Sequence, residues 1–378
     1  QTNVRLGAGV HTLTTSRQIN SLILEDGAIL NGNGFTLFVD SGQMILGDGA
    51  EINVETLNLG SRAYLTVAEG NTATINSTVI GAGSALSKIG YGKLVLSGDN
   101  QYGGPTFVNE GILNIQRSSG LGARATSGTG TVGNAGTAVR FGATLELEAT
   151  SFGDIQIDLE VLTLEGTGFN DMGAIRNVSG NNSWAGNISQ AGQNTNLLAL
   201  LDGFPVANAS QTWYAVESGS SLNLSGAIIN NVELVKIGAG QLELSGVLAN
   251  TNDATTRVLE GTLFLNKEPG VNAVINTLEI GSDLAGAPTA TVWFGGSDQI
   301  RDDRAIRVHA SGVLDLDGQS DAIDQLLLVA GATGSATVTL GTGTLSIARQ
   351  GLDNHTAILL YSIGKDNTGP GASSSARS

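Results

Sequence analysis

Residues 88–98 read KIGYGKLVLSG and residues 236–246 read KIGAGQLELSG, so the chain contains a duplicated block in which eight of eleven positions are identical. Each copy is followed by a second matching piece, TFVNEGILNI from Thr106 and TRVLEGTLFL from Thr256. The offset is 148 residues in the first piece and 150 in the second, so only the connecting loop has changed length. Self-similarity of this kind is typical of a solenoid, because each unit buries its apolar face by stacking on its neighbour.

The rest of the chain repeats a simpler pattern, in which a Gly or Asn turn precedes three to five residues with alternating Leu, Ile or Val. Leu57-Asn58-Leu59 and Leu145-Glu146-Leu147 are examples. In Leu-x-Leu the two leucines share one face of a strand, and the polar residue between them points to the wet face. The period is two rather than 3.6, and the nearest helix candidate, residues 195–203, is too short to be convincing.

Short strands at this density also suit a sandwich or a closed barrel, and their spacing alone does not decide. The long duplicated block, the scarcity of large aromatics (3 Trp, 5 Tyr, 9 Phe) and the aliphatic inward residues favour stacked coils. We predict an all-β, right-handed, single-stranded parallel β-helix of roughly 15–19 coils, if one coil takes about 20–25 residues. The helix is expected to run through residues 1–363, with repeat blocks at 88–115 and 236–265, followed by a flexible tail or linker at 364–378.

Two stretches depart from the regular pattern. Residues 117–136 are rich in Gly, Ser and Thr, and residues 296–307 hold the densest charge in the chain. We expect both to project from the rod.

Composition excludes several classes of function. The formal net charge is −16 with dispersed acidic residues, so nucleic acid and anionic membrane surfaces are poor partners. There is no cysteine, which removes disulfides and thiolate chemistry. No apolar run is long enough to span a bilayer as a helix. The chain begins at Gln1 rather than Met, as expected of a processed or excised segment.

The duplicated pattern, K-x-G-x-G-x-L-x-L-S-G followed by T-x-V-x-x-G-x-L-x-L, resembles the autotransporter-associated β-strand repeat of passenger regions in secreted bacterial surface proteins. In the second copy, the Asn100-x-Tyr102-x-Gly104 loop of the first has become Val-Leu-Ala-Asn-Thr-Asn. The matching residues that we expect to be structural are Lys88, Gly90, Gly92, Leu94, Leu96, Gly98, Thr106, Gly111, Leu113, Lys236, Gly238, Gly240, Leu242, Leu244, Gly246, Thr256, Gly261 and Leu263.

The resemblance implies a right-handed β-helix that is secreted or displayed on a bacterial cell surface. It implies a non-enzymatic role as a stalk, an adhesin segment or a fibre subunit, and it brings no catalytic residues and no cofactor. Regular strands near both ends of the chain suggest either end-to-end stacking, on itself or on neighbouring repeats of a longer chain, or ends that were created by truncation. Surface glycans and host or cell surfaces are further candidate partners.

The most specific enzymatic alternative is a β-helical polysaccharide lyase or hydrolase, which needs carboxylates that converge on one face of a coil. The best local cluster is Arg301, Asp302, Asp303, Arg304 and Arg307, with Trp293 nearby in sequence. Its simpler interpretation is a solvated loop whose charges pair with one another.

Metal sites are weakly indicated. His11, His309 and His355 lack the short-range partners of a metal ligand set. Asp315-x-Asp317-Gly318-x-x-Asp321 opens like a calcium loop, but Leu326 stands where the twelfth residue should be Glu. We therefore expect no metal, while calcium binding at these aspartates stays open.

The large aromatics offer a third possibility. Tyr102, Trp184, Trp213, Tyr214 and Trp293 would form sugar-stacking platforms if they surfaced on one side of the rod, which would make the chain a glycan-binding module. The simpler interpretation is that they cap or fill the interiors of coils.

Overall fold

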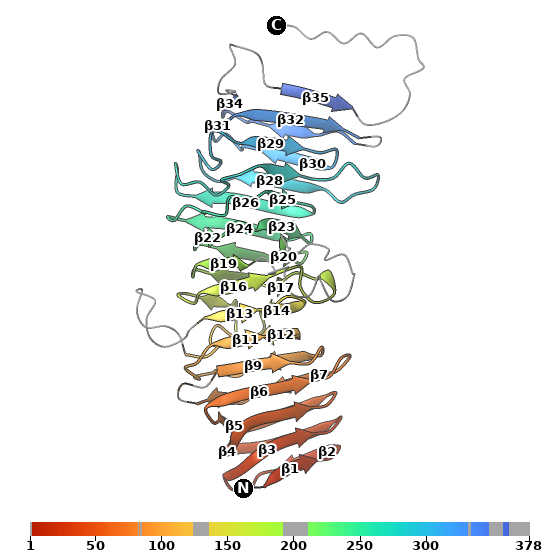
Figure 1. Cartoon of the computed structure of the whole chain (residues 1–378), viewed down its shortest axis with the longest axis vertical. Coiled ribbons are helices and arrows are strands. Elements are labelled where there is room, and N and C mark those ends of the chain that lie inside the picture. Colours follow the sequence, from red (N-terminus) through yellow and green to blue (C-terminus); the bar gives the residue numbers. More distant parts are fainter. Residues whose placement is uncertain are drawn as a thin grey trace, which may run out of the picture.

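The computed structural model describes residues 2–81, 83, 85–123, 136–191, 211–331, 334–347 and 358–362. They form a parallel β-solenoid of about 14 turns, which rises as one column from the N-terminal to the C-terminal end (Figure 1). Each turn contributes strands to three ladders that run along the axis. With about 4.8 Å between stacked strands, 14 turns make a rod of about 70 Å.

Ladder 1 is continuous and parallel from β2 to β35. Its strands are β2 (Gly9–Thr12), the start of β4 (Ala28–Leu46), the start of β5 (Ala50–Leu59), β7 (Thr72–Ile75), β10 (Lys93–Leu96), β12 (Gly111–Ile115), β14 (Ala143–Glu148), β17 (Ile175–Ser179), β20 (Gln211–Val216), β23 (Glu233–Ile237), β25 (Thr256–Val258), β27 (Leu278–Ile280), β29 (Ala305–Val308), β32 (Gln325–Ala330) and β35 (Ile358–Ser362).

Ladder 2 follows it on the second side, and hydrogen bonds between short turns carry it from β22 to β31. Its strands are β1 (Asn3–Leu6), the end of β3 (Arg17–Leu24), the end of β4, β6 (Arg62–Val67), β9 (Ala85–Ile89), β11 (Thr106–Val108), β13 (Thr137–Val139), β16 (Leu162–Glu165), β19 (Ile188–Ala191), β22 (Ile228–Ile229), β31 (Asp321–Ile323) and β34 (Leu345–Ile347).

Ladder 3 closes the coil. It is made of the start of β3, the middle of β4, the end of β5, β8 (Thr78–Ile80), β15 (Gln156–Ile157), β18 (Asn181–Trp184), β21 (Ser221–Leu224), β24 (Gln241–Gly246), β26 (Gly261–Lys267), β28 (Ala290–Phe294), β30 (Gly312–Asp315) and β33 (Thr337–Thr339). The described residues contain one short 3₁₀ turn, η1 (Phe169–Asp171), and no helix that could cross a membrane.

The parallel solenoid confirms the fold predicted from the duplicated block, but the coils are fewer than the 15–19 expected. Leu94 and Leu113 pair at a separation of 19 residues, whereas Leu113 and Leu145 pair across 32. Long insertions in the middle of the chain therefore consume residues without adding coils. The right-handed sense remains the expectation for parallel crossover connections.

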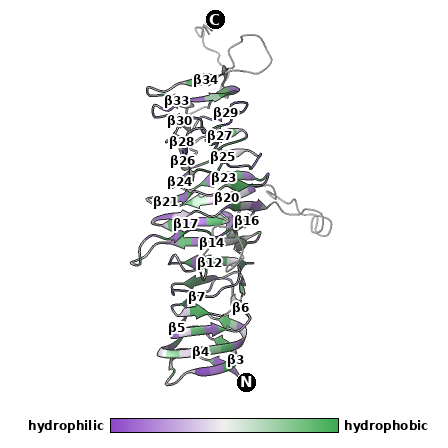
Figure 2. Cartoon of the chain, turned by 90° about the vertical axis from the view of Figure 1, so that its left-hand side faces the viewer, coloured by the Kyte–Doolittle hydropathy of each residue, from purple (hydrophilic) through white to green (hydrophobic). Residues whose placement is uncertain are grey.

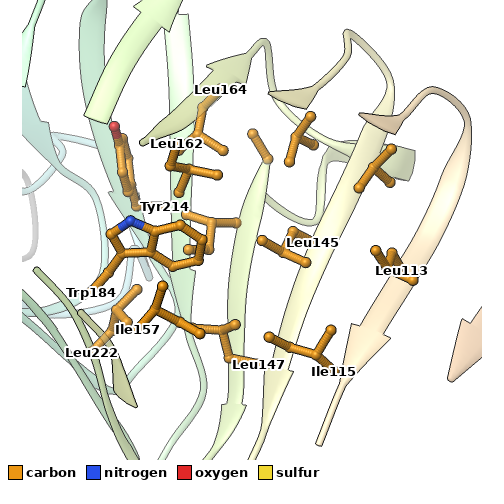
Figure 3. Close-up of a cluster of buried hydrophobic side chains, with 14 of the residues drawn as sticks. Leu113, Ile115, Leu145, Leu147, Ile157, Leu162, Leu164, Trp184, Tyr214 and Leu222 are labelled. Atoms are coloured by element: carbon orange, nitrogen blue, oxygen red, sulfur yellow. The ribbon is translucent and has the colours of Figure 1, made fainter. Parts of the chain in front are cut away.

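The core consists of inward columns, in which each residue stacks on its register partner in the next coil. One column runs from Leu94 through Leu113, Leu145 and Ile175 to Tyr214, and all five side chains are buried. Figure 3 shows the middle of the core, where the rings of Trp184 and Tyr214 fill the space beside these leucines. Apolar and polar residues alternate along the strands in Figure 2, as the period of two predicts.

The expectation that residues 296–307 project from the rod is wrong. Gln299, Ile300 and Ile306 are buried, Val274 and Ile300 form a parallel bridge, and β29 belongs to ladder 1. The apolar residues at alternate positions fix this stretch in the wall, and only its charges face outward. Of residues 117–136, the first seven turn tightly over the coil with Leu121 buried, and residues 124–135 lie outside the described part. The predicted tail at 364–378 lies outside it as well.

Candidate functional site

Both lysines of the duplicated block point into the core and are capped by backbone carbonyl oxygens. Lys88 Nζ donates to the carbonyls of the next two residues, at 3.3 and 2.6 Å, and to that of Glu110 at 3.0 Å. Lys236 Nζ repeats these contacts at 2.9 and 2.5 Å, and at 3.1 Å to Glu260. Three donors thus meet three acceptors. Burial lowers the pKa of Lys88 to about 8 and that of Lys236 to about 7, partly opposed by the nearby glutamates.

The glycines of the block allow one coil to approach the next. Gly90 and Gly238 have φ angles of 78° and 77°, and a Cβ there would lie 2.3 Å from the carbonyl oxygen of Val67 and 2.5 Å from that of Val216. The other motif glycines approach backbone oxygens as closely, with a Cβ distance between 2.0 and 2.6 Å: Gly92, Gly98, Gly111, Gly240, Gly246 and Gly261. The remaining motif residues are buried in the coil: Leu94, Leu96, Thr106, Leu113, Leu242, Leu244, Thr256 and Leu263.

A buried asparagine after each block joins three coils. Asn100 Oδ1 accepts from the Val79 N–H at 3.0 Å in the previous coil, and its Nδ2 donates to a carbonyl of the next coil at 2.9 Å. Asn250 does the same, accepting from Ile228 N–H at 2.9 Å and donating to Ala273 O at 2.7 Å. The second copy departs from the Asn-x-Tyr-x-Gly sequence of the first, but its longer Val-Leu-Ala-Asn turn brings Asn250 to the equivalent position.

The two copies face different sides of the rod. Lys88 lies on β9 in ladder 2, where it pairs with Leu65 and Val108. Lys236 lies on β23 in ladder 1, where it pairs with Tyr214. The leucine strand of the block moves correspondingly from ladder 1 (β10) to ladder 3 (β24). The second copy is therefore turned by one face about the axis, so a partner bound along one side of the rod could not contact both copies alike.

Charged residues on the outer faces pair along the axis between coils. Arg257 reaches Glu233 at 3.2 Å and Glu279 at 2.9 Å, and Arg307 reaches Glu279 at 3.1 Å from the other side. These four residues on successive coils neutralise one another. The pairing supports stacking and engages the charges of these four residues with one another.

Glu146 is an exception to the rule that the middle residue of Leu-x-Leu is exposed to solvent. It is the middle residue of Leu145-Glu146-Leu147, yet it is buried, with Lys93 at 2.7 Å, Arg176 at 2.8 Å and Asn114 Nδ2 at 3.0 Å. Burial alone would raise the pKa of this carboxyl, but Lys93, Asn114 and Arg176 together hold it below its usual range. The alternation of apolar and polar residues along the sequence does not show that Lys93, Asn114 and Arg176 surround this carboxylate.

Glu160 has no such basic partner among the residues that the structure describes. Its carboxylate accepts a hydrogen bond from the Thr137 hydroxyl, and its backbone carbonyl accepts from Trp184 Nε1 at 2.7 Å. Burial raises the pKa of Glu160 to about 7, and the Thr137 hydroxyl only partly offsets this.

The candidate enzymatic cluster is engaged in its own ion pairs. Arg301 pairs with Asp303 at 2.6 Å, and Arg304 donates to the Ile275 carbonyl at 3.0 Å and lies 3.5 Å from Asp303. The Arg301 guanidinium holds the pKa of Asp303 below its usual range, so that carboxyl is a poor proton donor. Trp293 lies on ladder 3, whereas Arg307 lies on ladder 1. The structure therefore does not bring the aromatic and this cluster into one groove.

The calcium-like aspartates do not converge. Asp321 is buried and accepts from the N–H groups of Gln299 and Ile300, at 2.8 and 3.1 Å. Burial raises the pKa of Asp321 to about 6. Asp315 Oδ1 accepts from Asp317 N–H at 3.0 Å within the turn. Within the described ranges, no three His, Asp or Glu residues are grouped to hold a metal ion.

The two described histidines, His11 and His309, have separate partners near opposite ends of the rod. His11 Nε2 lies 2.8 Å from the Gly7 carbonyl oxygen, and His309 Nδ1 lies 2.9 Å from an Asp283 carboxylate oxygen. His355 lies outside the described residues.

Of the five candidate aromatic side chains three are buried, Trp213 is half-buried and Trp293 is exposed. Tyr102, Trp184 and Tyr214 are buried and fill coil interiors, as the simpler interpretation predicts. Tyr102 also bonds its hydroxyl to Thr106 at 2.7 Å. Trp293 instead faces outward with 37% of its surface exposed and stacks on Phe264. Sequence reasoning singled out Trp293 but missed Phe264, although both occupy the middle of alternating apolar strands.

Comparisons with known proteins agree with the duplicated block. A model of the passenger-associated-transport-repeat matches residues 86–115 and 234–263. The chain is 27% identical over 272 residues to the BmaC autotransporter adhesin of Brucella suis biovar 1 (strain 1330), an alignment that covers 68% of this chain and 6% of that protein. No solved structure matches. The chain thus spans a small part of its relative's length. It carries two passenger-associated-transport-repeats on a β-solenoid and is distantly homologous to an autotransporter adhesin.

Proposed function

We propose that this chain is a non-enzymatic structural rod of a bacterial protein that is secreted or displayed on the cell surface, acting as a stalk, adhesin segment or fibre subunit. The observation that carries the proposal is ladder 1, which runs through the whole described chain without a break from β2 to β35. A continuous parallel ladder extends the molecule along one axis, and it resists local opening because each coil is held by both neighbours.

The chemistry of the repeats supports this role. The ammonium groups of Lys88 and Lys236 donate their hydrogen bonds to backbone carbonyls, and the side chains of Asn100 and Asn250 join neighbouring coils. Since the two copies also face different sides, the repeat acts on its own backbone rather than on an external ligand.

The extracellular location rests on the passenger-type relatives. The relative in Brucella suis is named an adhesin, which supports adhesion as the purpose of the rod. The net charge of −16 suits a soluble outer surface that does not attach to nucleic acid.

Small-angle scattering together with negative-stain microscopy of the purified chain tests the rod. We expect elongated particles whose repeating unit is about 70 Å long, from the strand spacing, and which survive limited proteolysis except at exposed loops. A compact particle, or one that is cut rapidly into many fragments, would overturn the proposal.

The polysaccharide-cleaving alternative is tested separately. The chain is incubated with acidic and neutral polysaccharides, and the products are sized by chromatography. We expect no shortening. Cleavage that disappears when Asp302 or Asp303 is replaced by Asn would replace the structural role with an enzymatic one.

We further propose that rods stack end to end. At the N-terminal end of the solenoid, Val4, Leu6 and Leu13 are only half-buried and line a groove of about 580 Å³. A parallel ladder presents complementary edges at its two ends, so a second copy can continue it head to tail.

A further inference from the structure

An aromatic platform lies on the outer face of ladder 3. Phe264 on β26 and Trp293 on β28 are register partners in successive coils, with ring centroids 4.8 Å apart and planes inclined by 29°. A Cβ at Gly295 would lie 2.6 Å from Phe264 Cζ, so the glycine lets that ring lie close against the sheet. Figure 2 places β24, β26, β28 and β30 in one column on this side of the rod.

Trp293 differs from the other two tryptophans in its indole N–H. Trp184 Nε1 donates to the Glu160 carbonyl at 2.7 Å, and Trp213 Nε1 donates to Gln211 Oε1 at 3.1 Å. For Trp293, no acceptor is found in the part of the chain that the structure describes, and 37% of the side chain is exposed. It therefore offers both an apolar face and an available donor.

Carboxylates flank the platform along the axis. The register partner of Phe264 in the previous coil is Glu243, and that of Trp293 in the next coil is Asp315. Asn266 Nδ2 donates to Glu243 Oε1 at 2.7 Å, and Asp317 N–H donates to Asp315 Oδ1 at 3.0 Å. These bonds fix each carboxylate through one oxygen. Among the described residues, neither carboxylate has a basic partner within ion-pair distance.

A row of neutral polar residues runs beside the platform. Gln241, Thr262 and Thr291 are register partners in three successive coils and are half-buried on the outer face. Their hydroxyl and amide groups can both donate and accept hydrogen bonds.

We propose that this surface binds a neutral glycan through a pyranose ring stacked on Trp293, whose indole is held in place by its stacking on Phe264. The apolar C–H face of a pyranose matches the indole ring, and its hydroxyls supply the donors that Glu243 and Asp315 accept. Acidic sugars are excluded because their carboxylates or sulfates would meet these two carboxylates on a chain of net charge −16. The site is additional to the structural role, which stands whether or not a glycan binds.

Titration calorimetry and tryptophan fluorescence of the purified chain test the site. The probes are neutral oligosaccharides of glucose, mannose and galactose, with oligogalacturonate and heparin fragments as acidic counterparts. We expect at least one neutral series to bind and to change the tryptophan emission. Trp293→Ala should weaken this binding about tenfold or more and abolish the emission change, whereas Trp293→Tyr should retain part of it.

Tyr91→Ala is the matched control, because Tyr91 is 51% exposed and stacks on Phe169 at 6.3 Å elsewhere on the rod. It should leave glycan affinity unchanged. Glu243→Lys should weaken neutral glycans and relieve the exclusion of acidic ones, with circular dichroism confirming the fold of each variant. The proposal is overturned if no neutral oligosaccharide binds at millimolar concentration, if binding survives Trp293→Ala unchanged, or if acidic fragments bind the wild-type chain as well as neutral ones.

Discussion

Lys236 lies in the same inward column as Leu94, five strand pairings further along ladder 1. In the first copy of the repeat the equivalent lysine, Lys88, lies in ladder 2 instead. Both lysines nevertheless have the same three carbonyl partners relative to their own turn. The repeat therefore specifies a local corner, the lysine with its three carbonyl partners, that occurs on two different faces of the coil.

Replacing either lysine by Met should destabilise the solenoid. Lys88→Met and Lys236→Met leave three carbonyl oxygens without their donor, and each unsatisfied buried group costs about 1–3 kcal/mol. The loss of a desolvated ammonium offsets part of this, so we expect a net cost of about 1–3 kcal/mol. Urea unfolding followed by circular dichroism measures it.

The matched control is Arg17→Met, which removes an exposed cation from β3 and should change stability little. If the corner is independent of the face, the two lysine variants should lose similar stability. A large loss in one and none in the other would contradict this equivalence.

Gly238→Ala tests the close approach of coils separately from backbone strain. Gly238 and Gly219 have nearly equal φ angles of 77° and 75°, but only at Gly238 would a Cβ meet backbone, at 2.5 Å from Val216 O. Both variants incur the strain of a left-handed alanine, about 1 kcal/mol. Gly238→Ala should cost clearly more than Gly219→Ala in thermal unfolding. Equal costs would mean that the coil spacing adjusts freely.

The fold could be predicted from sequence because its determinants are local and repeated. Leu94-Val95-Leu96 and its many counterparts fix inward columns through a period of two, and the duplicated block fixes the stacking. The number of coils could not be derived, since the irregular composition of residues 117–136 does not show that the whole 32-residue step from Leu113 to Leu145 makes a single coil. The one-face rotation of the second copy was equally hidden, because it depends on how many residues each intervening coil contains.

The candidate sites were harder to predict, because they depend on contacts between coils. Glu146 is covered by Lys93 and Arg176, which lie 53 residues and 30 residues away in the chain. Phe264 meets Trp293 only when β26 and β28 are aligned in register. A sequence pattern shows which residues point away from the core. Predicting which outward residues pair also requires the register between coils.

The two buried glutamates should affect stability in opposite directions as pH changes. The pKa of Glu160 is raised from 4.5 to about 7, so its protonated form stabilises the folded state below pH 4.5 and that contribution is lost as pH rises through 7. Glu160→Gln should therefore be more stable than the wild type at pH 8, with the difference vanishing near pH 4. Urea midpoints measured at intervals between pH 4 and 8 give the profile.

Glu146→Gln is the contrasting variant. The pKa of Glu146 is lowered by Lys93, Asn114 and Arg176, so its charged form stabilises the fold above pH 4.5 and is lost in acid. This variant should be less stable than the wild type at pH 7 and should converge with it in acid. A Glu160→Gln chain that is destabilised at pH 8 would show that the carboxylate has a partner after all.

End-to-end stacking should depend on the apolar groove at the first coil. Leu6 lies on β1, packs partly against the core and lines the groove with Val4 and Leu13, so a charge there would oppose contact with another coil. In sedimentation experiments over a range of concentrations, the wild-type chain should form longer species and Leu6→Asp should remain a single rod. Val247→Asp is the matched control, because Val247 is an apolar residue that is 68% exposed beyond β24, away from the first coil, and it should associate like the wild type. If Leu6→Asp associates as strongly as the wild type, or if Val247→Asp alone prevents association, the contact between rods lies on their sides and not at their ends.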